Sequence, residues 1–121
     1  MTIRPADHAF IGALVWRFPD LMDDLGEHLA DNNRELLPHV FMATVEKWAE
    51  SLLAGRTGEL AALLDFLADG VAGGFESVQN LIDVSFVENL PYPDEPTASI
   101  RAMLPAELRL LLQHGIDPDP E

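Results

Sequence analysis

TGELAALLDFLADGVAGG, at residues 57–74, is the stretch of sequence that decides the fold class. Its large apolar residues recur at the spacing that places them on one face of an α-helix: Leu60, Leu63, Leu64, Leu67 and Val71. Thr57 is suited to cap the amino end of this helix, and the glycines at positions 73 and 74 are suited to end it. The stretch therefore predicts an amphipathic helix that packs one face against a core.

Helical spacing of apolar residues continues on both sides of this stretch. It predicts earlier helices at residues 5–18, at 19–31, and from Pro38 to just before Gly55. Residues 75–90 are apolar on most sides, which is typical of a buried helix, so we place this segment at the centre of the fold. A last helical region runs from Thr97, as its cap, to a stop at Gly115, and Pro105 splits it.

The fold class that these segments predict is all-α, because alternation typical of strands is not found at any length. We expect a compact, irregular bundle of five to seven short helices. A length of 121 residues suits one domain. The prediction is a single all-helical domain at residues 1–116, followed by a frayed acidic tail at residues 117–121.

Charge is the most informative bulk property. The chain has 21 acidic and 7 basic residues and a net charge of −14, and no Lys or Arg lies between Arg56 and Arg101. Such a field repels nucleic acid and anionic membranes and attracts basic proteins. The alternative is that the acidity only maintains solubility. Because self-repulsion also costs stability, we favour a basic protein partner and expect neither nucleic acid nor membrane as partners.

The sequence also predicts a cytoplasmic protein. It has no cysteine, so disulfides and thiolate chemistry are excluded. The apolar run at residues 9–16 is too short for a signal peptide, and no apolar stretch approaches the length that spans a membrane.

Catalysis and cofactor binding find little support. The serines lie in helical stretches, and the glycine-rich residues 70–74 lack the lysine of a phosphate-binding loop. Asp24 and His28, one helical turn apart, are the best candidate metal ligands, but the paired motifs of known metal sites are missing. We expect these acidic residues to have a structural role only, and we expect no metal, no cofactor and no enzymatic activity. The remaining alternative is a metalloenzyme with carboxylate and histidine ligands.

Two surfaces are candidates for binding a partner. Glu76, Gln79, Asn80 and Asp83 form a single polar ridge on the otherwise apolar segment 75–90. The second candidate is the Pro-rich loop at residues 91–96, which carries Tyr92, Asp94 and Glu95. A rigid loop that combines an aromatic side chain with acidic ones suits an arginine-rich partner.

The two tryptophans differ in their expected exposure. Trp48 shares a helical face with other apolar residues, whereas Trp16 lies off the face formed by Phe10, Leu14 and Phe18. Of the two, Trp16 is therefore expected to be the exposed one.

Residues 59–67 (ELAALLDFL) and 78–90 (VQNLIDVSFVENL), with a looser match at 35–39 (ELLPH), resemble a family of small bacterial proteins. Members of that family resemble immunity proteins of polymorphic toxin systems. The resemblance implies that the chain binds a cognate basic toxin and occludes its active site; it transfers no functional residues. The alternative function is a cytosolic adaptor or regulatory subunit without an inhibitory role.

Overall fold

The computed structural model describes residues 5–116, with side chains placed as far as Gln113. It contains six α-helices and three short 3-10 helices. In chain order these are α1 (Pro5–Arg17), η1 (Pro19–Leu21), α2 (Met22–Asp31), α3 (Pro38–Ser51), α4 (Thr57–Ala72), α5 (Glu76–Ser85), η2 (Val87–Asn89), η3 (Ala98–Met103) and α6 (Ala106–Ile116). The described residues contain no strand, so the predicted all-α class is confirmed. The acidic tail predicted at residues 117–121 lies outside the described residues.

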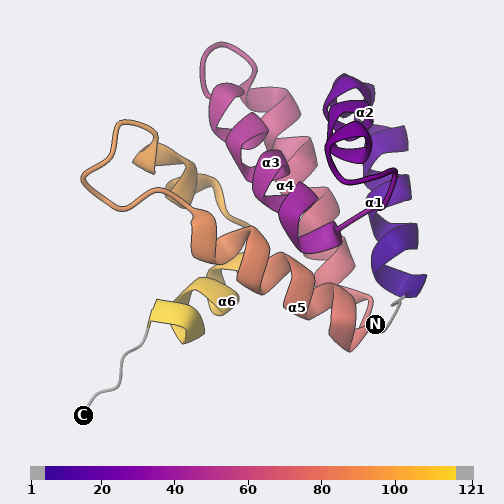
Figure 1. The fold of residues 1–121 in the computed structure, drawn as a ribbon. Coiled ribbons are helices and arrows are strands. Elements are labelled where there is room, and N and C mark those ends of the chain that lie inside the picture. Colours follow the sequence, from indigo (N-terminus) through magenta and orange to yellow (C-terminus); the bar gives the residue numbers. More distant parts are fainter. Residues whose placement is uncertain (1–4, 117–121) are drawn as a thin grey trace.

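The helices form an irregular bundle around α5 (Figure 1). Helix α5 contacts α1, α3, α4 and α6 and runs across the ends of α3 and α4. The segment that follows α5 projects on the side of the molecule away from α1 and α2. None of the helices within residues 5–116 combines the length and the apolarity needed to cross a membrane.

The core is one cluster of buried apolar side chains to which α1, α3, α4, α5 and α6 contribute, and α2 packs the partly buried Leu25 against it. The leucines predicted from the stretch at residues 57–74 are all fully buried. Aromatic rings join three helices in this core: Phe18 from the end of α1 contacts Trp48 of α3 and Phe66 of α4, each with ring centroids 5.9 Å apart. In α4, the spacing of apolar residues therefore identified the buried face correctly.

The central helix is shorter than its apolar pattern predicts. It ends at Ser85, and the chain turns at Phe86 into η2, whereas the pattern continues to Leu90. The side-chain amide of Asn89 donates a hydrogen bond to the carbonyl oxygen of Ser85 (2.9 Å), which satisfies a backbone acceptor at the helix end. Phe86, Val87 and Leu90 stay buried after the turn, so apolar spacing alone could not locate this break.

Both predicted threonine caps fail as caps. Arg56 occupies the N-cap position of α4, Thr57 is the first helical residue, and no side chain caps this end. Thr97 does precede η3, but its hydroxyl donates to the carboxylate of Glu50 instead of capping the backbone. The predicted break at Pro105 is confirmed, although α6 runs past Gly115 to Ile116.

A glycine substitution in α4 tests the close packing of α4 on α1 and α5. A Cβ added at Gly70 would lie 2.6 Å from the Phe10 ring and 3.1 Å from Cδ1 of Ile82. Gly70→Ala should therefore lower the free energy of unfolding by about 1–2 kcal/mol, measured by urea denaturation. Gly58→Ala is the control in the same helix, since its Cβ would meet no atom within 4 Å. Equal stabilities of the two variants would contradict this packing.

Candidate functional site

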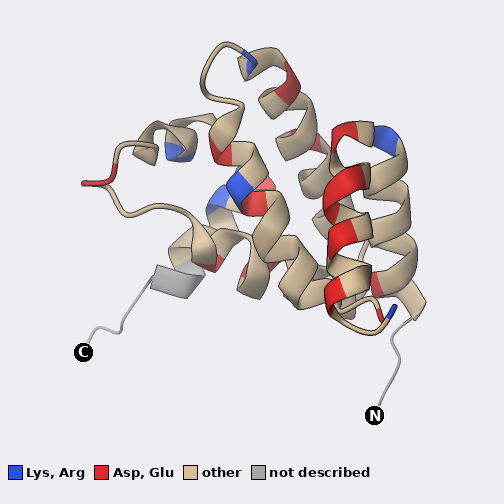
Figure 2. Cartoon of the chain, turned by 45° about the horizontal axis from the view of Figure 1, so that its top comes forward, with Lys and Arg blue, Asp and Glu red and all other residues tan. Residues whose placement is uncertain are grey.

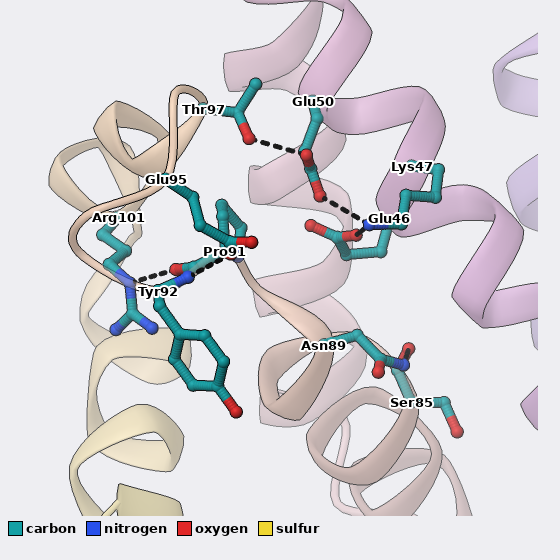
Figure 3. A network of polar contacts seen from close by, with 10 residues as sticks. All are labelled: Glu46, Lys47, Glu50, Ser85, Asn89, Pro91, Tyr92, Glu95, Thr97 and Arg101. Atoms are coloured by element: carbon teal, nitrogen blue, oxygen red, sulfur yellow. Dashed lines mark hydrogen bonds and ion pairs between the residues drawn. The ribbon is translucent and has the colours of Figure 1, made fainter.

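The loop at residues 91–97 is braced from within and from its flanks (Figure 3). The backbone N–H of Tyr92 donates to the Glu95 carboxylate (2.6 Å), and the N–H of Glu95 donates to the Tyr92 carbonyl (2.9 Å). On the side of η3, Nε of Arg101 donates to the carbonyl oxygen of Pro91 (2.6 Å). These bonds hold a proline-rich turn in one conformation, which lowers the entropy lost when it binds a partner.

The predicted binding residues of this loop are exposed. The Tyr92 side chain is 70% exposed, and Asp94 and Glu95 are also exposed. Their roles differ, however, because the Glu95 carboxylate accepts a backbone hydrogen bond that shapes the loop. Tyr92 and Asp94 are therefore available to a partner, whereas Glu95 also positions them.

A hollow of about 550 Å³ adjoins the loop. It lies between η2, the loop, η3 and α6, and its lining is Val87, Glu88, Leu90, Tyr92, Pro93, Arg101 and Leu112. An apolar floor with a few polar groups at its edges is the usual composition of a binding pocket. Sequence reasoning identified Tyr92 but missed this hollow, since its walls come together only in the tertiary structure.

A pair of carboxyl groups on α3 lies behind the loop. Glu46 is fully buried, and among the described residues neither of its oxygens accepts a hydrogen bond from an N–H or a hydroxyl. Its neighbour Glu50 accepts a hydrogen bond from the Thr97 hydroxyl (2.6 Å), which ties the loop to α3. Lys47 Nζ lies 3.9 Å from Glu46 Oε1, but its side chain is mostly exposed, so it compensates the buried group only weakly.

Burial and the neighbouring carboxylate set the protonation of this pair. Desolvation, followed by the hydrogen bond to Glu50 and the charge of Glu50, raises the pKa of Glu46 to about 8. Burial also acts to raise the pKa of Glu50, but hydrogen bonds from Glu46 and Thr97 and the charge of Lys47 outweigh it and lower that pKa. At neutral pH, Glu46 is therefore mainly protonated, which avoids the cost of burying its charge.

A sequence signal for Glu46 existed. Met42, Glu46 and Ala49 follow one another at helical spacing, so the carboxyl group occupies a position on the buried face of α3. The identity of its neighbours could not be predicted in this way. Thr97 lies 47 residues from Glu50 in the chain, and the tertiary fold alone brings the two together.

The predicted ridge on α5 is only partly a free surface. Glu76 and Asn80 are exposed. Gln79 is half-buried, and its side-chain amide donates to the carbonyl oxygen of Val71 (2.8 Å) near the end of α4. Asp83 is half-buried and takes part in an interaction within the protein. The ridge therefore contributes to the packing of α5 as well as to the surface.

His28 has a structural position. Its imidazole is buried against the Phe41 ring, and its Nε2 accepts a hydrogen bond from the backbone N–H of Leu37 (3.0 Å), the residue before α3. The Nε2 lone pair is thus used to fix the start of α3, which leaves Asp24 without its histidine partner for a metal. Within residues 5–113, no group of three or more His, Cys, Asp or Glu residues is arranged to hold a metal ion.

Basic and acidic side chains are used differently in this fold. Arg56 pairs with Asp20 and Glu59, Lys47 pairs with Glu46 and Glu50, and Arg101 and Arg109 each donate to a backbone carbonyl. The other two described cations, Arg17 and Arg34, are exposed, and Arg17 lies over the Phe18 ring. Most acidic side chains are instead exposed. Figure 2 shows the acidic residues spread over several helices. The exposed acidic residues away from these ion pairs include Asp23, Glu27, Asp31, Glu35, Asp65, Asp69, Glu76, Glu88, Asp94, Glu95 and Glu107. The field outside the molecule is therefore strongly negative.

The fold and the site together define an all-helical domain with an acidic surface and a braced loop beside an apolar hollow. The chain belongs to the family described as a domain of unknown function (DUF7674), whose model matches residues 11–116. Comparisons with curated proteins and with solved structures give no match. The family description names neither an activity nor a partner.

Replacement of Glu46 by glutamine tests the protonated state of this residue. Because its pKa is raised above the ordinary value of 4.5, the stability contributed by Glu46 is complete below pH 4.5 and is lost as the pH rises to about 8. Glu46→Gln keeps the shape and a donor for Glu50 but cannot lose a proton. The free energy of unfolding of this variant, compared with that of the wild type, should rise by on the order of 3 kcal/mol between pH 5 and pH 8, measured by urea denaturation.

Glu35→Gln is the matched control, since it removes the same charge from an exposed position. Its stability should keep the pH dependence of the wild type. If Glu46→Gln kept that dependence as well, Glu46 would not be protonated at neutral pH.

Proposed function

We propose that this chain is an immunity-type protein of the cytoplasm that binds a basic toxin and occludes the toxin's active site. The observation that carries the proposal is the excess of exposed acidic side chains: most acidic side chains face solvent, whereas Lys47, Arg56, Arg101 and Arg109 bond within the fold and only Arg17 and Arg34 of the described cations are exposed without a carboxylate partner. Solubility alone would not require so large an imbalance, which also costs stability by self-repulsion. A basic partner would convert that cost into binding free energy.

The choice of a toxin as the partner rests on the resemblance of residues 59–67 and 78–90 to proteins similar to immunity proteins. A toxin that acts on an anionic substrate needs a basic cleft. An inhibitor with a net charge of −14 is complementary to such a cleft and competes with the substrate for it.

The braced loop is the proposed contact. Tyr92 supplies an aromatic anchor and Asp94 an acidic side chain at the tip, and the backbone that carries them is already fixed before a partner binds. The adjoining hollow accepts the methylene chain of a lysine or arginine of the toxin along Leu90 and Leu112. The charged end then lies towards Glu88, since Arg101 on another wall repels it.

Electrostatics and packing have separate effects in this scheme. Long-range attraction speeds the encounter, and salt screens it. The contacts of Tyr92 and the hollow set the lifetime of the complex, because they are short-ranged and desolvated. An inhibitor of this kind therefore binds fast at low salt and keeps a measurable affinity at high salt.

Affinity capture from the native host tests the partner class. Tagged protein should capture one dominant basic protein at physiological salt, and the purified chain should abolish the enzymatic activity of that protein. Capture of a basic protein whose activity is unchanged would favour an adaptor or regulatory subunit. Failure to capture any basic protein at either about 0.15 M or about 0.5 M salt would contradict the proposal.

Variants of the loop test the proposed contact once the partner is in hand. Tyr92→Ala should raise the dissociation constant about 30-fold, mainly through a faster off-rate, because it removes an aromatic anchor. Asp94→Lys should slow association about 3- to 10-fold at low salt and have little effect at 0.5 M. Both rates can be measured by surface plasmon resonance.

Asp65→Lys on α4 is the matched control, an equal charge reversal at an exposed position outside the loop. It should change association less than Asp94→Lys does. Equal effects of the two reversals, together with normal binding by Tyr92→Ala, would place the contact elsewhere on the acidic surface.

A further inference from the structure

The outer face of α1 differs from the rest of the surface. Trp16, near the end of this helix, is 82% exposed, the highest value among the large apolar residues that face solvent in the described part of the chain. The prediction that it is more exposed than Trp48 is therefore confirmed. The remaining exposed residues on the same face are Pro5, Ala9, Gly12 and Ala13, and none of them is polar.

Charge is missing from this face. Helices α2, α4, α5 and α6 each expose at least one acidic side chain, whereas α1 and α3 expose none. In α1 the acidic residue Asp7 is buried, and only Arg17 at the end is charged and exposed. Figure 2 shows α1 largely free of red beside the acidic residues of α2. The solvent face of a surface helix is ordinarily polar or charged. A neutral, apolar face on a chain of this charge indicates that the face is covered in the working protein.

Gly12 in the middle of this face has no role within the chain. A Cβ added there would meet no atom within 4 Å, so no neighbour in the fold requires a glycine. Glycine nevertheless weakens a helix relative to alanine. Gly26 of α2 and Gly58 of α4 have equally open surroundings, so Gly12 does not by itself indicate a partner, but it leaves room for a close approach at this face.

We propose that a second copy of this chain covers the face, through antiparallel packing of α1 on α1. The face has its one bulky side chain at one end and small residues at the other, so it is complementary to itself under a two-fold rotation. That rotation places Trp16 across from Ala9 of the second copy and Gly12 across from Ala13 of the second copy. The indole then fills the space above a small residue, and the two helices approach closely at the glycine.

Charge favours a second copy over a basic partner at this face. A basic protein is drawn to the acidic surfaces, and α1 offers it no carboxylate. Two chains of charge −14 repel each other wherever acidic residues would meet, so the neutral face is where a like-charged copy can approach. The remaining repulsion between the two chains is long-ranged and is screened by salt.

The size of the face predicts a weak dimer. Helix α1 has 13 residues and is therefore roughly 20 Å long. One helix face covers less than the roughly 800 Å² per partner of a standard interface. We expect a dissociation constant on the order of 100 μM at moderate salt, which makes the dimer dependent on protein concentration.

The dimer does not depend on the proposed inhibitory function. Figure 1 shows α1 on the opposite side of the molecule from the loop at residues 91–97, so each copy keeps its loop free. The two interactions also respond to salt in opposite directions. Added salt strengthens the association of two acidic chains and weakens the binding of a basic protein, so failure of one proposal leaves the other testable.

Sedimentation equilibrium of the purified chain between about 10 and 500 μM tests the dimer. The dimer fraction should rise with concentration and should be larger at about 0.5 M than at about 0.05 M NaCl. Trp16→Ala and Ala13→Glu should each raise the dissociation constant at least about tenfold, since one removes the bulky side chain and the other introduces a charge at the helix crossing.

Ala61→Glu, an exposed position on α4, is the matched control and should dimerise nearly as the wild type does. Circular dichroism of each variant should show unchanged helix content, because all three positions are exposed. A wild-type chain that stays monomeric at 500 μM and 0.5 M NaCl would overturn the proposal. Dimers that persist unchanged in both α1 variants would overturn it as well, since the contact would then lie on another face.

Discussion

The packing of α5 against four other helices is the interaction on which the rest of the structure depends. Val78, Leu81 and Ile82 are buried between α1, α3, α4 and α6, and the chain leaves this helix through the buried residues Phe86 and Val87. The loop at residues 91–97 therefore starts from a point fixed in the core. Arg101 also holds the start of the loop through the Pro91 carbonyl, and the hydrogen bond from Thr97 to Glu50 fixes its other end. The position of the candidate site follows from core packing before any partner is present.

This core also has to withstand the net charge. Each exposed carboxylate adds to the repulsion that opposes a compact state. The fold limits that cost locally: Arg56 joins two acidic residues from separate segments, and the protonated state of Glu46 removes one charge from the interior. The outer surface has no such compensation at Asp94, Glu88 or Asp65. The charge of Glu46 is thus removed from the interior, whereas negative charge is retained on the surface where a partner can reach it.

The sequence predicted the features that depend on local spacing and missed those that depend on tertiary contacts. The buried face of α4 and the exposure of Trp16 follow from helical periodicity, and the break at Pro105 follows from proline stereochemistry. The end of α5 at Ser85 was missed, because apolar spacing continues past it. The raised pKa of Glu46, the contact of Thr97 with Glu50 and the hollow beside Tyr92 were also missed, since they depend on residues from distant parts of the chain.

The hydrogen bond from Thr97 to Glu50 links the geometry of the loop to the ionisation of Glu46. When Glu46 is protonated it donates to Glu50, and Glu50 can still accept from Thr97 at its other oxygen. When Glu46 loses its proton, its buried carboxylate lies beside the half-buried carboxylate of Glu50, with the exposed Lys47 as the neighbouring cation, and the added charge of Glu95 lies on the loop itself. Repulsion then acts directly between α3 and the loop. A cation bound at the loop would lower that repulsion. The binding of a basic partner and the ionisation of Glu46 are therefore coupled through the carboxyl groups of Glu46, Glu50 and Glu95.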